Sequence, residues 1–172
     1  MQAAFDEFRG VKRRQEIRGE AAGVTVIDDF GHHPTAICET LTALRVRFPG
    51  RRLWAIFEPR SNTTRRRIFQ GELATALSSA DGVFVSKVDR LDELAEEDRL
   101  QPEKLVADIT ALGRPAQYLA DADAIVAALT PQALPGDVVV VFSNGAFGGI
   151  HAKLLRALRE RQTTDALSSG EL

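Results

Sequence analysis

Short apolar runs alternate with segments of helical periodicity along most of this chain. The apolar runs predict strands at 24–27, 53–57, 83–86, 117–119 and 138–142. Apolar residues recur at helical spacing between and after these runs, which predicts helices at 34–47, 64–79, 101–112, 121–129 and 148–161. This regular alternation predicts an α/β fold whose strands are joined by helical crossovers.

Two segments indicate how the strands are arranged. Val138–Phe142 is apolar at every position, as in a parallel strand that helices cover on both faces. Gln15–Arg18 alternates in character and reaches the first apolar strand through Gly19–Gly23, as an antiparallel edge hairpin would. We therefore expect a Rossmann-like, mostly parallel sheet of about six strands, with one antiparallel edge strand and helices on both faces.

The remaining stretches are polar. Residues 87–100 are dense in charge, which predicts an exposed connection that can hold one turn of helix. Residues 163–172 are polar and lack periodicity, so we expect a flexible tail. The folded domain is therefore predicted at 15–162.

The composition narrows the class of protein. A chain of 172 residues with 44% hydrophobic content fits one globular domain, and a formal charge of -2 argues against general nucleic-acid binding. Cys38 is the one cysteine, which excludes a disulfide framework or a cysteine metal site. The sequence has neither an 18-residue apolar run nor a signal-peptide pattern. We expect a soluble cytoplasmic protein without nucleic-acid or membrane partners.

Asp28–Pro34 is the segment richest in candidate chemistry. It places two acids, a glycine and two histidines between a strand and a helix, where open α/β sheets bind their ligands. His33 or Asp29 could instead cap the helix, with Pro34 in its first turn. The two histidines favour ligand binding or proton transfer over capping alone.

The same segment could also be considered as a metal site. Its four candidate ligands are Asp28, Asp29, His32 and His33. Adjacent residues in one turn rarely all face a single ion, so we predict no metal site here.

Two further loops follow predicted strands. In Glu58–Arg67, serine, asparagine and threonine could cap the next helix, but Arg65–Arg67 oppose the positive end of its dipole. This opposition favours an anionic ligand nearby. Ser143–His151 contains three glycines, which would let backbone N–H groups approach an anionic or carboxylate-bearing ligand.

A basic run, Phe8–Glu16, precedes the first strand and by composition is a solvated arm. The phosphate-binding pattern GxxxxGK[ST] does not occur in the sequence. The chain therefore has no phosphate-binding loop of that type.

Together and in this order, these loops resemble the C-terminal domain of the Mur ligases, the ATP-dependent amide-forming enzymes of peptidoglycan synthesis. Asp28–Ile37 is similar to the family's DD[FY][AG]HHPT element. Glu58–Thr63 and Ser143–His151 are similar to EPRSNT and SNGGFGGIH, which distinguish the family's recycling branch from the branch that adds L-alanine. Ala146 stands where the recycling branch usually has a glycine, and we expect it to be tolerated. The resemblance covers Phe8–Arg161.

The resemblance implies a function. The recycling branch uses ATP and Mg²⁺ to join UDP-N-acetylmuramate to the murein tripeptide L-alanyl-γ-D-glutamyl-meso-diaminopimelate through an acyl phosphate. A complete ligase also has an N-terminal UDP-sugar domain and a central ATPase domain, whose motifs are not in this sequence. The resemblance thus implies an isolated third domain, inactive alone and without a tightly bound cofactor. Residues 1–14 would be the linker from the central domain.

The resemblance also implies roles for individual residues. Arg14, Asp29 and His32 would face ATP, and Asp29, His32 and His33 would serve catalysis. Arg60 is suited to a peptide carboxylate because its guanidinium donates a fork of hydrogen bonds. The implied substrate-binding set is Arg60, Ser61, Asn62, Ser143, Asn144, Gly145 and His151.

Two other interpretations stay open. The domain could belong to the branch that joins L-alanine to UDP-N-acetylmuramate, which shares the Asp28–Ile37 element. It could also be a free-standing module that binds a nucleotide or an anionic peptide without catalysis. The missing phosphate-binding loop favours this second alternative if the chain is complete.

Overall fold

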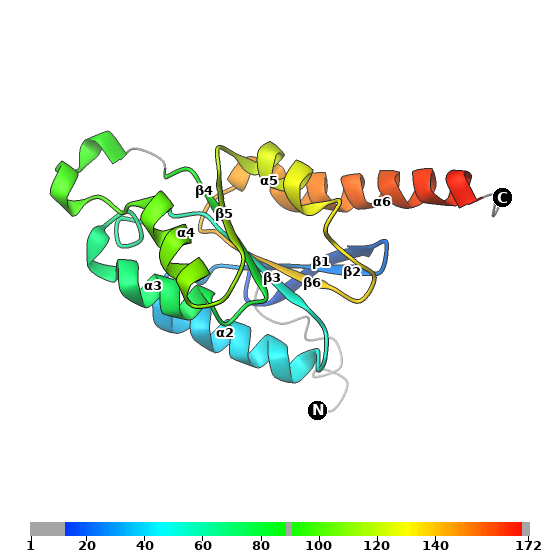
Figure 1. Ribbon diagram of the computed structural model, residues 1–172, viewed down its shortest axis with the longest axis horizontal. Helices are drawn as coiled ribbons and strands as arrows, with labels where there is room; N and C mark the ends of the chain where they lie inside the picture. Colours follow the sequence, from blue (N-terminus) through cyan, green and yellow to red (C-terminus); the bar gives the residue numbers. More distant parts are fainter. Residues whose placement is uncertain (1–12, 89–90, 170–172) are drawn as a thin grey trace, which may run out of the picture.

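The computed structural model describes residues 13–88 and 91–169. One six-stranded sheet runs through the domain (Figure 1). Its spatial order is β1 (Glu16–Ala21), β2 (Val24–Asp29), β6 (Val138–Phe142), β3 (Leu53–Phe57), β4 (Gly82–Ser86) and β5 (Ala116–Leu119). Neighbouring strands pair in parallel, except that β1 and β2 are antiparallel. The predicted fold class is confirmed.

Helices cover both faces of the sheet. The first face carries α2 (Pro34–Arg47), α3 (Gln70–Leu77) and α4 (Pro102–Ala111), and the second carries α5 (Ala122–Leu129) and α6 (Ile150–Ser169) (Figure 1). Short 3-10 helices lie in the connections: η1 (Arg67–Phe69), η2 (Leu91–Glu93), η3 (Glu96–Asp98) and η4 (Phe147–Gly149). The charged connection predicted at 87–100 therefore holds two such turns, η2 and η3.

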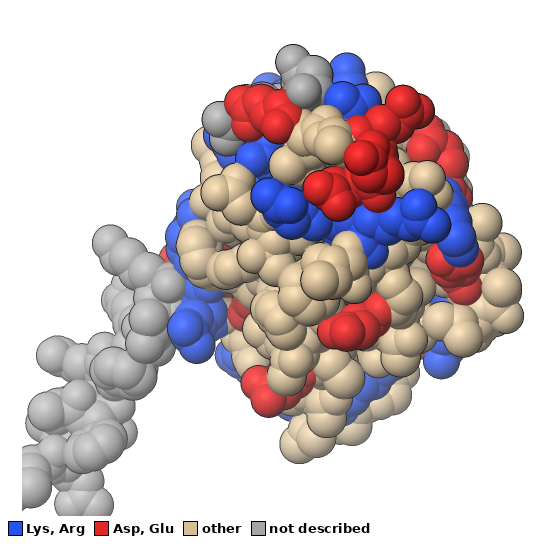
Figure 2. Space-filling model, turned by 90° about the vertical axis from the view of Figure 1, so that its left-hand side faces the viewer, with Lys and Arg blue, Asp and Glu red and all other residues tan. Residues whose placement is uncertain are grey.

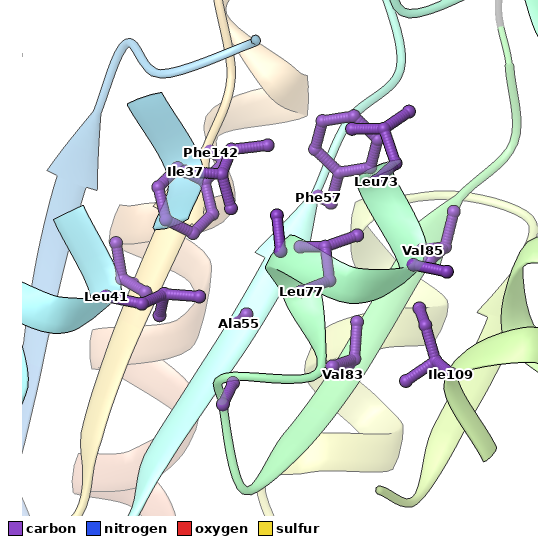
Figure 3. Packing of buried hydrophobic residues seen from close by; sticks show 14 of the residues in the cluster. Ile37, Leu41, Ala55, Phe57, Leu73, Leu77, Val83, Val85, Ile109 and Phe142 are labelled. Carbon is purple, nitrogen blue, oxygen red and sulfur yellow. The ribbon is translucent and has the colours of Figure 1, made fainter. Parts of the chain in front are cut away.

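The core has one apolar layer on each face of the sheet, because successive strand side chains point to opposite faces. Phe57 and Phe142 pack towards α2 and α3, where Ile37 and Leu73 meet them (Figure 3). Residues that alternate with these along the strands, such as Ile56, pack towards α5 and α6. Both layers are apolar, which explains why β3 and β6, in the middle of the sheet, lack a polar position.

The β1–β2 hairpin is tighter than the sequence predicted. Strand β1 continues to Ala21, so only Ala22 and Gly23 form the turn, with φ of 50° and 71°. Positive φ at both central residues defines a type I′ turn, whose twist matches that of the paired strands. The predicted edge hairpin is confirmed, but its predicted turn, Gly19–Gly23, was too long.

The helix predicted at 64–79 begins later, because residues 61–66 form a separate hydrogen-bonded turn before η1 and α3. The end predicted for the last helix, residue 161, was wrong, since α6 continues to Ser169. Thr163 and Thr164 lie on this exposed extension and donate to the carbonyls of Arg159 and Glu160. This exposed part of α6 has no apolar stripe, and without that periodicity its sequence could not be told from a flexible tail. The rest of the predicted tail, 170–172, lies outside the described residues, as does most of the predicted linker.

Candidate functional site

The carboxyl ends of the parallel strands form one edge of the sheet, at the left of Figure 1. Strand β6 lies between β2 and β3, with Phe142 opposite both Asp29 and Phe57. The three loops singled out in the sequence therefore lie side by side. Figure 2 looks onto this side and shows Lys and Arg side chains next to Asp and Glu side chains, rather than a surface of one sign.

Asp29 anchors the loop after β2. Asp28 and Asp29 are the last residues of the strand, not loop residues as predicted, and both are buried. The Asp29 carboxylate accepts hydrogen bonds from the backbone N–H of Gly31 at 2.7 Å and of Gln15 at 2.9 Å. A carboxylate has about four acceptor sites, so Asp29 can hold this loop and still accept from a ligand hydroxyl.

The two histidines have different surroundings. His33 is the N-cap of α2, where its Nδ1 accepts from the N–H of Thr35 at 3.3 Å, and its ring packs edge-on against Phe69. This confirms the capping alternative for His33 but not for Asp29. The Nδ1 of His32 lies 3.0 Å from the carbonyl oxygen of Phe30. Within residues 13–88 and 91–169, no three His, Cys, Asp or Glu side chains converge to hold a metal ion.

A hollow of about 370 Å³ collects the residues that the resemblance assigned to the nucleotide side. Arg14, Asp29, His32 and His33 all line it, together with the first turns of α2. The Arg14 side chain is exposed and forms no ion pair with another described residue. A cation, a carboxylate and two imidazoles around one hollow suit an anion that also carries hydroxyl groups.

A second cluster joins the loops after β3 and β6. The hydroxyl of Ser143 donates to the carboxylate of Glu58, whose other oxygen lies 3.7 Å from Nη1 of Arg60. A Cβ at Gly145 would lie 2.6 Å from the same Nη1, so glycine lets Arg60 pack against this loop in its present position. Arg60, Ser143 and Gly145, three residues of the implied substrate-binding set, thus lie together around Glu58, which sequence reasoning did not assign.

The start of the loop after Arg60 is held by its own side chains. The hydroxyls of Ser61 and Thr64 lie 2.8 Å apart, and each accepts from the backbone N–H of the other residue. The side-chain oxygen of Asn62 accepts from Arg65 at 2.6 Å. The polar groups of Ser61 and Asn62 therefore shape the turn that presents Arg60.

Two of the three arginines for which an anionic ligand was predicted, Arg65 and Arg66, are paired with carboxylates of the domain itself. The Arg65 side chain is 5% exposed and pairs with Glu93 at 2.9 Å, while the exposed Arg66 lies 3.8 Å from Asp98. For Arg65 and Arg66, carboxylates from the connection after β4 thus supply the negative charge that the sequence pattern required. That connection was not predicted to reach this loop.

Arg13 joins the start of the domain to the glycine-rich loop. Its guanidinium donates to the carbonyl oxygens of Ser143 at 2.7 Å and Gly145 at 2.9 Å, and lies 3.4 Å from Asp28 and over the ring of Phe30. The sequence offered no signal that singled out Arg13 within its basic run. The residue that holds the loop in place is therefore next to the predicted Arg14.

Asn144 and Ala146 complete this loop. Asn144 is half-buried, and its side chain makes no hydrogen bond with any described residue. Ala146 has an ordinary helical φ of -79°, so this position does not require glycine. The replacement of the usual family glycine therefore strains neither the backbone nor the loop.

His151 lies beneath the loop, with its Nε2 3.4 Å from the carboxylate of the buried Asp28. Burial lowers the pKa of His151 below its ordinary value of 6.5. The positive charges of Arg18 and Arg13 lower it further, whereas the negative charge of Asp28 raises it. His151 is therefore a partly buried imidazole that is uncharged near neutral pH. Its position on the second face of the sheet separates it from the hollow lined by His33.

This pKa shift predicts how stability depends on pH. The unfolded chain takes up a proton at His151 near pH 6.5, whereas the folded chain takes it up only at lower pH, so stability falls as the pH drops below about 6.5. The His151→Gln variant should show a weaker fall between about pH 6.5 and 5. Urea unfolding of both proteins across this range measures the effect, and parallel curves would contradict it.

A second hollow, of about 470 Å³, opens at the ends of β3, β4 and β5. Glu58, Lys87, Tyr118 and Asp121 contribute its polar groups. The sequence analysis assigned none of them, because each belongs to a different segment and no local motif connects them. The hollow adjoins the cluster of Arg60 and Ser143 through their shared neighbour Glu58.

The fold and these loops are shared with a family of ligases. Residues 13–145 match the family described as Mur ligase, glutamate ligase domain, so the chain belongs to the Mur ligases as their C-terminal domain. Over 163 residues it is 44% identical to the UDP-N-acetylmuramate–L-alanyl-γ-D-glutamyl-meso-2,6-diaminoheptandioate ligase of Escherichia coli (strain K12). That match covers 92% of this chain and 33% of the relative, so the chain spans about a third of that protein.

Two solved structures are similar. The murein peptide ligase of Psychrobacter arcticus has a TM-score of 0.74 and 38% identity, over 91% of this chain and 32% of that one. A domain from a putative UDP-N-acetylmuramate:L-alanyl-γ-D-glutamyl-meso-diaminopimelate ligase of Haemophilus ducreyi has a TM-score of 0.65 and 40% identity. That match covers 84% of this chain and 99% of the other, so a domain of this extent has been studied by itself. Separately, no described helix has the length and hydrophobicity needed to cross a membrane.

Proposed function

We propose that this domain binds the acceptor peptide in an ATP-dependent ligase that joins UDP-N-acetylmuramate to L-alanyl-γ-D-glutamyl-meso-diaminopimelate. Diaminopimelate is the 2,6-diaminoheptandioate in the names of the relatives. The single observation that carries the proposal is the cluster of Arg60, Ser143 and Gly145 around Glu58, beside the hollow of Asp29 and His33. The domain would act with an N-terminal UDP-sugar domain and a central ATPase domain.

Arg60 is the proposed partner of a peptide carboxylate. It lies at the carboxyl edge with its guanidinium against Gly145, and its side chain is 42% exposed. A guanidinium binds a carboxylate through two parallel hydrogen bonds, which suits the carboxylates of the D-glutamyl and diaminopimelyl residues. Glu58 keeps the guanidinium in place, and Asn144 and Ser143 offer further polar groups.

Residues around the hollow after β2 fit a nucleotide. ATP and Mg²⁺ would supply the phosphoryl group that activates the lactyl carboxylate of the sugar nucleotide. Arg14 would contact phosphate, and Asp29 would accept from a ribose hydroxyl while it holds Gly31. No phosphate-binding loop of the GxxxxGK[ST] type occurs in this sequence, so the ATPase loop would come from the central domain.

The domain's contribution to the reaction would be to position the peptide. The α-amine of its L-alanyl residue attacks the activated lactyl carbonyl carbon, the bond to phosphate breaks, and the amine loses a proton. Holding the amine in line converts this attack into an effectively intramolecular step. His33 lies at the start of α2 and is exposed, so it would be the imidazole nearest the incoming amine. His32 would line the same face.

Titration of the ¹⁵N-labelled chain with the tripeptide tests this proposal by NMR. We expect backbone amide shifts at residues 58, 60–62 and 143–145, and much smaller shifts with a tripeptide whose carboxylates are amidated. ATP should shift amides at 29–33 instead. Equal responses to the two peptides, or no response to the tripeptide at millimolar concentration, would overturn the proposal.

A further inference from the structure

We propose that the hollow at the ends of β3, β4 and β5 binds the far α-amino acid group of the third acceptor residue. This inference rests on the proposed function and adds to it a pocket that selects diaminopimelate over lysine. The hollow measures about 470 Å³ and lies on the other side of Glu58 from Arg60 and Ser143. None of its other polar groups serves the site described above.

The walls of the hollow suit a methylene chain. Val88 and Phe147 are buried apolar residues that line it, together with Ala122 and the partly buried Leu91. Diaminopimelate carries three methylene groups between its two amino acid centres. Apolar walls stabilise such a chain by removing its surface from water.

The charges at the mouth of the hollow match a zwitterion. Lys87 follows β4, is exposed, and forms no ion pair with any described residue. Glu58 and Asp121 supply negative charge, and Asp121 also caps α5 through the N–H of Ala124. A free α-amino acid group carries one carboxylate and one ammonium, which Lys87 and the two acids can pair with respectively.

Tyr118 adds a neutral donor to the hollow. Burial, with a smaller contribution from the charge of Glu103, raises the pKa of Tyr118 above its ordinary value of 10.0. Its hydroxyl therefore keeps its proton and can donate to a carboxylate across the neutral pH range. A carboxylate near Lys87 and Tyr118 would thus have two donors of different kinds.

The spacing along the sheet edge matches the length of the peptide. The hollow of Asp29 and His33 lies at the end of β2, and Lys87 follows β4, three strand positions away. Neighbouring strands lie about 4.8 Å apart, so this separation is about 14 Å. Three extended residues span at most about 10 Å, at about 3.5 Å each. The γ-glutamyl link and the long side chain of the third residue lengthen the peptide further, so it can span this separation. Arg60 lies between, beside the glutamyl carboxylate.

Lysine at the third position provides the sharpest comparison. A lysyl tripeptide keeps the far ammonium but lacks the far carboxylate. Lys87 therefore contributes only to the diaminopimelyl peptide, whereas Arg60 serves both peptides. Lys87 is exposed, so its replacement by methionine removes the charge and keeps most of the length without disturbing the core.

NMR titrations of the chain with the diaminopimelyl and lysyl tripeptides test this inference. The wild-type chain should prefer the diaminopimelyl peptide, with amide shifts at 86–88 and 118–122. Lys87→Met should weaken the binding of this peptide about fivefold, since an exposed charge pair contributes up to about 1 kcal/mol. The affinity for the lysyl peptide should stay unchanged. Lys104→Met is the matched control, because Lys104 pairs with Asp108 on α4 and lies outside the hollow.

The outcomes separate the two proposals. If both peptides bind and Lys87→Met leaves the preference intact, or weakens both peptides equally, the pocket is overturned and the acceptor function stands. If neither peptide binds the wild-type chain, the acceptor function fails and the pocket fails with it. A loss of preference confined to Lys87→Met supports both.

Discussion

Replacement of Arg60 by alanine should raise the KM for the tripeptide about 10- to 100-fold in the complete ligase in which we propose this domain acts. A hydrogen bond to a charged group is worth about 1.5–3 kcal/mol, and each 1.4 kcal/mol changes affinity tenfold. The kcat should change much less, because the carboxylate that Arg60 binds is remote from the reacting amine. Steady-state kinetics with varied tripeptide at saturating ATP and UDP-N-acetylmuramate measure both constants.

Arg66→Ala is the matched control for this prediction. Arg66 belongs to the same loop and is 49% exposed, but it faces Asp98 at 3.8 Å. Its removal should leave the KM for the tripeptide unchanged. An unchanged KM in Arg60→Ala as well would exclude Arg60 from carboxylate binding.

Replacement of Asp137 by alanine should lower the free energy of unfolding by about 3 kcal/mol. Asp137 precedes β6 at the amino edge of the sheet and is 3% exposed. Its carboxylate accepts from Arg52 at 2.6 Å, from the indole N–H of Trp54 at 2.9 Å and from the N–H of Leu134 at 2.9 Å. The variant leaves the N–H groups of Trp54 and Leu134 without this acceptor and removes the ion pair of Arg52, which keeps its hydrogen bond to the carbonyl of Gln132. A buried donor without a partner costs more than its hydrogen bond contributes.

The same carboxylate connects stability to pH. Burial alone would raise the pKa of Asp137, but the hydrogen bonds from Arg52, Leu134 and Trp54 outweigh it and hold the pKa below its ordinary value of 3.8. The stability from Asp137 is thus complete above the unfolded pKa and is lost as the pH falls through the folded pKa. Urea unfolding at pH 7 measures the loss of unfolding free energy in Asp137→Ala. Thermal unfolding of this variant should show a Tm lower by roughly 6–12 °C.

Asp123→Ala provides the comparison for Asp137. Asp123 is 73% exposed and pairs with Lys153 at the surface of the second helical layer. Its removal should change stability by less than about 0.5 kcal/mol. If Asp137→Ala costs no more than this control, the buried network contributes little to the fold.

The sheet could be predicted because its strands are buried on both faces. Val138–Phe142 and Leu53–Phe57 are apolar throughout, and this pattern indicates central parallel strands. The hairpin turn was less visible, because Ala22 adopts a positive φ that alanine rarely takes and gives no turn signal. The end of α6 could not be predicted, since its exposed part lacks the apolar stripe on which periodicity depends.

The candidate site was partly predictable for a similar reason. Loops that follow parallel strands meet at one edge, so Arg60 and Ser143 could be expected near one another. The sequence could not show which of Arg13 and Arg14 contacts the glycine-rich loop. The direction of each side chain depends on the folded backbone, in which Arg13 has a positive φ of 59°. Lys87 and Glu58 line the same hollow only after β3 and β4 have paired.

The most direct test of the account is the reaction of the complete ligase with UDP-N-acetylmuramate, ATP and Mg²⁺, with either the tripeptide or L-alanine as acceptor. The account predicts UDP-N-acetylmuramoyl-tripeptide and ADP from the tripeptide, with a much lower rate for L-alanine and no product from an N-acetylated tripeptide. Preference for L-alanine would contradict it and assign the domain to the other branch. Absence of product with both acceptors would instead favour a binding module.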